Sequence, residues 1–396
     1  MTLEHAALRQ QLAEMARQAV QHAGDQHDRL AEALALLRDR AGAFAELASR
    51  AAASQWTPFR AAIPTEPLDA RHPKPTPLSA YTVVAADGSH VDPDRHGPTV
   101  CYLLNFGIVT IRYGVEPQAN LVSLPVLGFR HEDLYLSSGS TELPVQDRVL
   151  AIKRQVDEMR HLAATALEAR ADLPVVALAD GTLLVSAWGQ GDDSQVLELL
   201  VARFLEALDT LRQRRIAIAS YISRPRGSDL LNLLRLAACP YRDADCSGHC
   251  RGVAPSALAC ARFAGLTDRH IFEQLPLRPG ERSGVFVSSW ATSRQRYGDH
   301  LAHFYYLHVG SEIARVEIPQ WVAEDADLLA LTQATVLDQV RRGQGYPRAL
   351  IEAHEKAVLT GNDRRAFVAM TELALTGLGL RAKDSLKDLS KSIGQY

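Results

Sequence analysis

Two stretches of the chain share one design: Tyr81-Thr-Val-Val-Ala-Ala-Asp87-Gly88-Ser89 and Pro174-Val-Val-Ala-Leu-Ala-Asp180-Gly181-Thr182. Each begins with a run of small and β-branched apolar residues, which is typical of a buried strand. Each ends in Asp-Gly followed by Ser or Thr, which predicts a sharp turn directly after the strand. The sequence therefore places a carboxylate at the end of each of two buried strands.

The segments around these two stretches alternate between strand and helix patterns. Further strands are predicted at residues 100–113, 120–129, 216–222, 285–289 and 303–318. Helices are predicted at residues 144–170, 193–213, 325–342 and 347–358. We therefore expect an α/β protein with a mixed β-sheet flanked by helices.

Residues 1–55 are rich in Ala, Leu, Gln, Arg and Glu, and their apolar residues recur near helical spacing. We expect Gly24 and Asp25 to divide them into two helices, so the sequence predicts an N-terminal helical hairpin extension. The hairpin either packs on the body or forms an arm that docks a partner or a second copy. Residues 56–80, with their repeated prolines, are expected to form an extended connector. The main domain then spans 81–375, and residues 376–396 form a C-terminal tail.

The composition is that of a globular protein: 47% of the residues are hydrophobic, 22% are charged, and the formal net charge is −3. This balance excludes nucleic-acid binding by bulk charge and leaves a local basic groove open. No apolar run reaches the ~18 residues that span a membrane, so we expect a cytoplasmic protein without membrane association. The sequence motifs of P-loop, dinucleotide, serine-hydrolase and zincin enzymes do not occur.

The paired aspartates point to a metal site. One Asp-Gly after a strand is most often only a structural turn. Two aspartates at adjacent strand ends repel each other unless a cation neutralises them, and hard divalent ions prefer carboxylate oxygens. Such ions commonly serve phosphodiester cleavage. The helix at 144–170 offers Asp157 and Glu158 as further acids, although a charged residue on a helix more often faces solvent.

A second candidate segment runs from Gly345-Tyr346-Pro347 to Ala353-His354-Glu355. Pro347 suits the first turn of a helix, and His354 follows two turns later on nearly the same face. An imidazole beside a metal ligates it or moves protons. A single histidine is nevertheless more often structural or exposed.

Four of the five cysteines lie within residues 239–260, in the order Cys239, Cys246, Cys250 and Cys260. Such crowding in a cytosolic chain predicts a structural Zn²⁺ or iron–sulfur site, although the spacing is neither that of zinc ribbons nor that of ferredoxins. The alternative is that some of these residues are small buried hydrophobes.

Taken together, the motifs resemble the NurA domain over about residues 75–375. The resemblance rests on the two Asp-Gly stretches, on the C-terminal segment, and on Tyr221-Ile-Ser-Arg-Pro-Arg226 and Glu312-Ile-Ala-Arg-Val-Glu-Ile-Pro319. NurA nucleases are manganese-dependent DNA-end-processing enzymes with an RNase H-like core. They form dimers and work with the hexameric HerA ATPase and translocase. The resemblance therefore implies an RNase H-like fold, a Mn²⁺ or Mg²⁺ cofactor, and DNA, a second copy and a HerA-type motor as partners.

The resemblance also implies the site residues. The family's aspartates, tyrosine and histidine fall on Asp87, Asp180, Tyr346 and His354. Its glutamate falls on Glu158, with Asp157 and Glu168 as alternative registers. Asp87, Glu158 and Asp180 would hold the metal ion, His354 would ligate it or assist proton transfer, and Tyr346 would orient the DNA or the water.

Arginines near these motifs are candidate contacts to the DNA backbone, namely Arg224, Arg226 and Arg282. The implied function is a metal-dependent nuclease that processes DNA ends in double-strand break repair with a HerA-type translocase. The alternative is a catalytically inactive subunit that scaffolds or regulates that motor.

Overall fold

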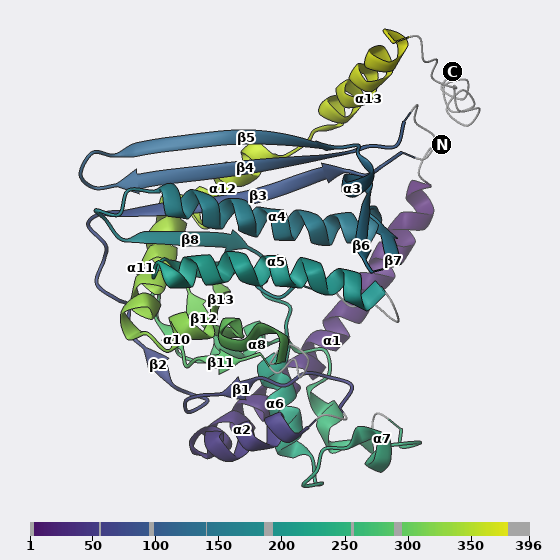
Figure 1. The fold of residues 1–396 in the computed structure, drawn as a ribbon. Coiled ribbons are helices and arrows are strands. Elements are labelled where there is room, and N and C mark those ends of the chain that lie inside the picture. Colours follow the sequence, from purple (N-terminus) through teal and green to yellow (C-terminus); the bar gives the residue numbers. More distant parts are fainter. Residues whose placement is uncertain are drawn as a thin grey trace. The chain divides into compact units, whose positions relative to one another are not determined.

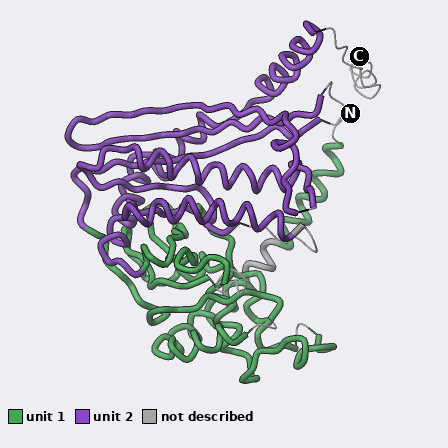
Figure 2. The backbone as a smooth tube through the Cα atoms, viewed as in Figure 1, with its two compact units in different colours: residues 1–75, 222–323 green, residues 76–221, 324–396 purple. Residues whose placement is uncertain are grey.

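The computed structural model describes residues 4–54, 57–94, 99–139, 141–185, 193–254, 257–288 and 295–378 (Figure 1). The chain divides into two compact units, and each unit is built from two separate segments (Figure 2). Residues 1–75 and 222–323 form unit 1, and residues 76–221 and 324–396 form unit 2. The expected main domain at 81–375 thus contains segments of both units, while most of the expected C-terminal tail lies outside the described residues.

Unit 2 contains the sheet that carries the Asp-Gly stretches. Its strands are β3 (Tyr81–Val91), β4 (Tyr102–Tyr113), β5 (Gln118–Gly128), β8 (Val175–Asp180) and β9 (Ala217–Ile222). They lie in the order β9-β8-β3-β4-β5. The pairs β3–β4 and β4–β5 are antiparallel, whereas β3–β8 and β8–β9 are parallel. This arrangement confirms the expected mixed sheet of RNase H-like type.

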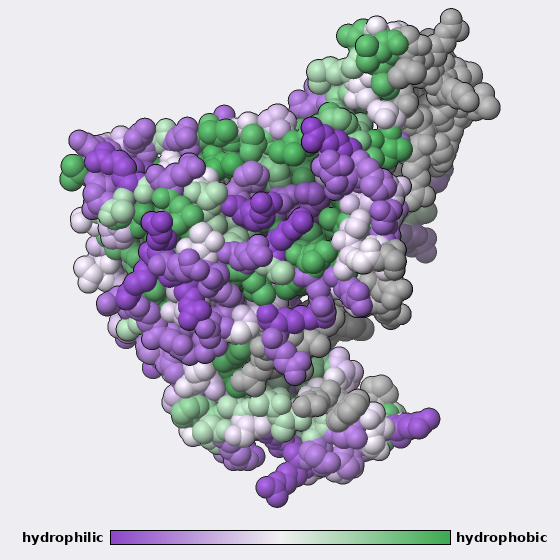
Figure 3. All heavy atoms as spheres, viewed as in Figure 1, coloured by the Kyte–Doolittle hydropathy of each residue, from purple (hydrophilic) through white to green (hydrophobic). Residues whose placement is uncertain are grey.

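Burial explains why the strands take these places. β9 is buried from Ala217 to Tyr221, and β8 is buried at its three central apolar residues, as expected of parallel strands covered on both faces. β5 lies at the end of the strand order and is mostly exposed, with Val122, Val126 and Leu127 open to solvent. Apolar surface accordingly gathers over this margin of unit 2 in the space-filling view (Figure 3).

Helices cover both faces of this sheet. They are α4 (Asp147–Glu168), α5 (Asp193–Gln213), α11 (Ala326–Arg342) and α12 (Arg348–Ala357), followed by α13 (Gly361–Thr376). Neighbouring residues of β4 point to opposite faces: the Phe106 ring packs on His161 of α4, whereas Gly107 faces α12. α4 and α12 therefore lie on opposite sides of β3 and β4. A short helix, α3 (His131–Leu134), and the hairpin of β6 (Tyr135–Ser138) and β7 (Thr141–Pro144) complete the unit.

Unit 1 combines helices with strands that pair in antiparallel fashion. Its strands are β1 (Ile63–Pro64), β2 (Arg71–His72), β10 (Arg282–Ser283), β11 (Phe286–Val287), β12 (Ala302–His308) and β13 (Ile313–Pro319). Its helices include α1 (His5–Arg40), α2 (Phe44–Ala53), α6 (Asp229–Ala238), α7 (Cys246–His249), α8 (Asp268–Gln274) and α10 (Gln320–Ala323). Among the described residues, none of the helices has the length and apolar character to cross a membrane.

Two local expectations are wrong. α1 runs without interruption through Gly24 and Asp25, because one helical glycine costs only about 1 kcal/mol and the remaining residues favour a helix. The chain turns instead after Arg40, in the short 3₁₀ segment Ala41–Ala43. The turn expected after Ala86 is also absent, since β3 continues through the Asp-Gly pair to Val91. The corresponding glycine after β8, Gly181, does turn the chain, with φ at +77°.

Candidate active site

The three acidic residues implied by the sequence meet in one hollow of unit 2. The hollow has a volume of about 430 Å³, and Asp87, Glu158 and Asp180 all line it. Asp87 and Asp180 come from the parallel strands β3 and β8, whose register pairs Ala86 with Ala179. Asp87 and Asp180 are therefore each the next residue after a directly paired alanine, on two adjacent parallel strands.

Glu158 reaches the hollow from α4, past a residue that lacks a side chain. A Cβ atom at Gly88 would lie 2.6 Å from Glu158 Oε1, which is closer than real Cβ contacts. Gly88 is therefore needed for the approach of α4 to β3 rather than for a turn.

The electrostatics of the hollow show that the carboxylates act on one another. Burial is the main cause that raises the pKa of Glu158 to about 8, and Asp87 and Asp180 raise it further while Arg154 lowers it. Burial also raises the pKa of Asp180; the hydrogen bond from Tyr346 opposes this shift, and the charge of Asp87 adds to it. A cation bound among these groups would relieve their mutual repulsion.

Tyr346 and His354 join the site from the opposite face of the sheet. The hydroxyl of Tyr346 donates a hydrogen bond to Asp180 Oδ1 at 2.8 Å, and its ring packs edge-on against Tyr221. The Nδ1 atom of His354 lies 2.8 Å from Asp87 Oδ2, so it donates to that carboxylate when it carries a proton. Each of these two residues thus holds one of the paired aspartates.

Gly107, Asn105 and Gln339 fix the position of α12, the helix that carries His354. Gly107 of β4 allows close packing, since a Cβ atom there would overlap the carbonyl oxygen of Ala353. The buried amide of Asn105 donates to the carbonyl oxygens of Lys356 and Ala357 at the end of α12.

At the other end of α12, the buried side chain of Gln339 in α11 acts as a bridge. Its oxygen accepts from the backbone N–H of Ala349 at 2.9 Å, and its amide nitrogen donates to the Tyr81 hydroxyl at 2.8 Å. One end of α12 is therefore tied to β4, and the other is tied through Gln339 to β3, the strand that carries Asp87.

Arg154 is a site residue that the motif reasoning missed. Its guanidinium donates to Glu158 Oε1 at 2.6 Å and to the carbonyl oxygen of Gly88, and it lines the hollow together with Arg148. The signal that could have found it is the four-residue spacing from Glu158 on one helix face.

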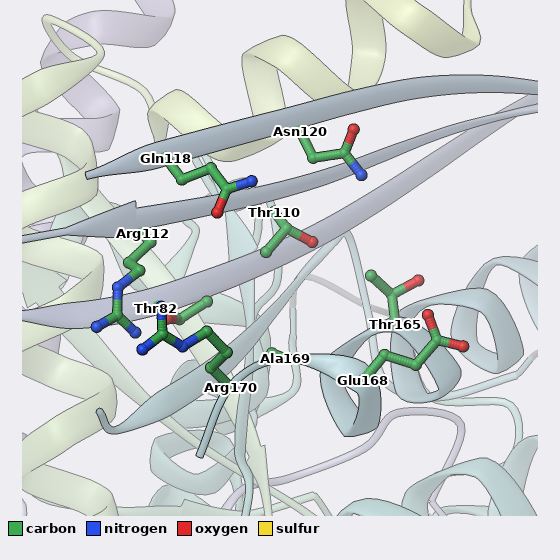
Figure 4. Close-up of a pocket in the computed structure, with 9 residues that line it drawn as sticks. All are labelled: Thr82, Thr110, Arg112, Gln118, Asn120, Thr165, Glu168, Ala169 and Arg170. Carbon is green, nitrogen blue, oxygen red and sulfur yellow. The ribbon is translucent and has the colours of Figure 1, made fainter. Parts of the chain in front are cut away.

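Three acidic residues of α4 are candidates for the family's glutamate, and the structure places them in different surroundings. Asp157 is buried in ion pairs with Lys153 and Arg160 and does not line the hollow. Glu168 lines a different hollow of about 240 Å³ near the other end of β3 (Figure 4). Glu158 is therefore the member of this set that lies beside the aspartates.

The candidate DNA-binding arginines belong to unit 1. Arg224 and Arg226 are exposed, and Arg224 lies 3.6 Å from a carboxylate oxygen of Glu312. Arg282 is only 7% exposed; it donates to the backbone oxygen of Ser283 and lies over the Tyr305 ring. Its guanidinium does not present a surface to a phosphate.

The donor set of the hollow suits a hard divalent ion, since it offers three carboxylates and one imidazole. Within the part of the chain that the structure describes, no three His, Cys, Asp or Glu side chains are already arranged as a metal site. The carboxylates are instead held by Arg154, Tyr346 and His354, and an ion would have to replace part of these contacts.

The strands of unit 2 form a mixed sheet of RNase H-like order, and two of the three acidic residues of the hollow lie on its central strands β3 and β8. The model of the NurA domain family matches residues 81–359, which is more than half of the chain. The chain therefore belongs to the NurA domain family.

Similar solved structures are distant. A crystal structure of NurA with manganese is 11% identical, with 77% of this chain and 91% of that chain covered and a TM-score of 0.40. The catalytic domain of human Endonuclease V is 13% identical, with 76% and 84% covered and a TM-score of 0.26. A type 1 RNase H with a type 2 active-site motif is 13% identical, with 40% and 71% covered and a TM-score of 0.20. The comparison with curated proteins found no match.

Proposed function

We propose that this protein is a metal-dependent deoxyribonuclease that processes DNA ends. The observation that supports this most directly is the convergence of Asp87, Glu158 and Asp180, from three separate elements, in one hollow. Structural ion pairs would not explain it, because the three carboxylates line one hollow, where Arg154 forms its ion pair with Glu158. Membership of the NurA family adds the expectation of nuclease chemistry.

In this proposal the three carboxylates hold Mn²⁺ or Mg²⁺. Such an ion, when bound, polarises the phosphodiester and lowers the pKa of water at the site. Tyr346 fixes the rotamer of Asp180, and His354 either takes a place among the ligands or exchanges a proton through its imidazole. Arg148 and Arg154 line the hollow as well, so a phosphate group there meets guanidinium donors beside the carboxylates.

The proposed partners are DNA, a second copy of the chain and a HerA-type hexameric translocase, and the support for them is membership of the family. Arg224 and Arg226 remain candidates for contact with backbone phosphates because both side chains are exposed. Arg282 is left out of this proposal because it is buried.

Cleavage of end-labelled single- and double-stranded DNA with Mn²⁺, Mg²⁺ or EDTA tests the proposal. We expect metal-dependent cleavage by the wild type and its loss in Asp87→Ala, Asp180→Ala and Glu158→Gln. Glu168→Gln is the matched control, because Glu168 lies on the same helix and lines a different hollow.

Two results would count against the proposal. Cleavage that survives in all three variants would show that a contaminant or another site cuts the DNA. A folded wild type that does not cleave, even with a HerA-type motor added, would favour the inactive subunit. In that case, a change in the ATPase rate of the motor on addition of this protein is the decisive measurement.

A further inference from the structure

The segment 239–260 of unit 1 has almost no apolar core of its own. Among its described residues, Ala244 is the buried apolar residue, and most of the others are exposed. Its regular structure is limited to α7, a single turn, and to the start of the 3₁₀ segment Ala259–Phe263. Ordering such a segment costs conformational entropy, which requires stabilisation from another source.

The four clustered cysteines occupy the ends of these short elements. Cys239 caps the end of α6, Cys246 begins α7, Cys250 caps its end, and Cys260 lies in the 3₁₀ segment. The 3₁₀ segment packs on α6, so the first and last of the four are brought near each other by that contact.

The thiols themselves are neighbours. The N–H of Cys250 donates to the carbonyl oxygen of Cys246 at 3.2 Å, which places the two side chains one helical turn apart. Burial raises the pKa of Cys246, and the charges of Cys250, Cys260 and Cys239 raise it further. The thiols of Cys239, Cys250 and Cys260 therefore each lie within electrostatic range of Cys246.

Polar contacts rather than apolar packing hold the turns that carry these thiols. The side chain of Asp245 accepts from the backbone N–H groups of Ser247 and Gly248, which fixes the start of α7. Arg50 of α2 donates to the carbonyl oxygen of Cys239 at 2.9 Å. These contacts fix the turns that carry Cys246 and Cys239.

The alternative of inert core cysteines fits Cys101 and does not fit the cluster. Cys101 is buried, with 8% of its surface exposed, and stands alone in the sequence. The four clustered cysteines are only partly buried, and none forms a disulfide. They therefore do not serve as the small buried hydrophobes of a core.

We propose that Cys239, Cys246, Cys250 and Cys260 together form a closed tetrathiolate site for a thiophilic metal centre, either Zn²⁺ or an iron–sulfur cluster. Four sulfur ligands in tetrahedral arrangement are typical of these two centres. The sulfurs are not already set as metal ligands among the described residues, so binding draws the short elements together and releases the thiol protons. The role is structural, because all four positions are filled by protein.

Metal analysis of the full-length protein tests this site without any assay of DNA cleavage. We expect about one equivalent of zinc per chain after aerobic purification, or iron with visible absorption after anaerobic purification. Cys246→Ser, Cys250→Ser and the double variant should lose this metal, while the control Cys101→Ala keeps it. The zinc and iron measurements distinguish the two centres.

Measurements on the wild type keep the proposal testable even where a variant fails to fold. A thiol reagent should release the metal as the clustered cysteines react, and chelation should speed proteolysis within residues 239–260. Wild-type protein without stoichiometric metal under both purifications would overturn the proposal. Retention of the metal by the double variant would overturn it equally.

Discussion

At the scale of single residues, Gly88 controls the position of Glu158. In Gly88→Ala the new Cβ atom would meet the end of the Glu158 side chain, which can swing aside at small cost to the fold. We expect the cleavage rate to fall by about 100-fold, as a displaced catalytic group commonly causes, with little change in thermal stability. Kinetics with Mn²⁺ and a thermal melt measure both effects. Gly42→Ala is the control, since a Cβ atom there meets nothing within 4 Å.

The raised pKa of Glu158 predicts a pH-dependent stability. The folded protein holds this proton up to about pH 8, whereas the unfolded chain releases it near its usual pKa of 4.5. The stabilisation is complete below the lower value and is lost as the pH rises toward the higher one. Urea unfolding in EDTA should therefore show stability that declines over this interval, and Glu158→Gln should flatten the decline. Identical slopes in the two proteins would refute the assignment.

The hydroxyl of Tyr346 supports Asp180 rather than the substrate directly. Removing it in Tyr346→Phe takes away the hydrogen bond that favours the ionised carboxylate. We expect the affinity for Mn²⁺ to weaken by about 10- to 100-fold, as when other partners of metal ligands are removed. The Mn²⁺ concentration that gives half-maximal cleavage measures this change. Tyr135→Phe, at an exposed tyrosine, should leave it unaltered.

At the scale of elements, the packing of α12 on β4 depends on Gly107. A side chain there meets backbone atoms of Ala353 and Ala357, which cannot rotate away. We expect Gly107→Ala to lower the free energy of unfolding by about 1–3 kcal/mol and to reduce cleavage because His354 moves with the helix. Denaturant unfolding and cleavage measured side by side check this. Loss of cleavage without loss of stability would argue against it, and that is the pattern expected at Gly88 instead.

The sequence predicted which strands unit 2 contains better than it predicted where those strands end. The alternation of apolar residues located β3, β4, β5, β8 and β9 within a few positions, because burial on a pleated sheet leaves a local pattern. The two Asp-Gly pairs looked alike, yet β3 passes through its pair and β8 ends at the other. The difference arises from β4, which pairs with β3 as far as Val91, and a pairing with a separate strand leaves no signal within the Asp-Gly motif.

The candidate site was predictable only in part. The motifs located Asp87, Asp180, Tyr346 and His354, and the structure brings all four together. Arg154 and the supports of α12 were missed, because their roles follow from contacts between residues far apart in the sequence. Motifs reveal chemistry at fixed spacing, whereas such supports appear only once the chain is folded.

At the scale of the whole molecule, the chain forms two units from interleaved segments. A search for linkers assumes continuous domains, so it does not predict units that are each built from two separate segments. All five predicted catalytic residues nevertheless belong to unit 2. The candidate metal centre is therefore complete within one unit.

This completeness predicts that metal binding stabilises the protein without DNA. Mn²⁺ at about 100 times its dissociation constant should add ~2.7 kcal/mol to the unfolding free energy of the folded unit that binds it. Calorimetry of the wild type with and without Mn²⁺ measures the gain. Asp87→Asn should show almost none, and an equal gain in that variant would place the ion elsewhere.

The exposed strand β5 has a consequence for the behaviour of the protein in solution. Its outer edge is long and carries apolar side chains. A strand from another molecule pairs readily with such an edge, and this pairing is a route to fibrous aggregation. Pro125, which lies opposite Asn105 near the middle of the strand, has no N–H to donate. A strand arriving from another molecule thus meets an interrupted ladder, and replacing this proline would expose the protein to misassembly during expression and refolding.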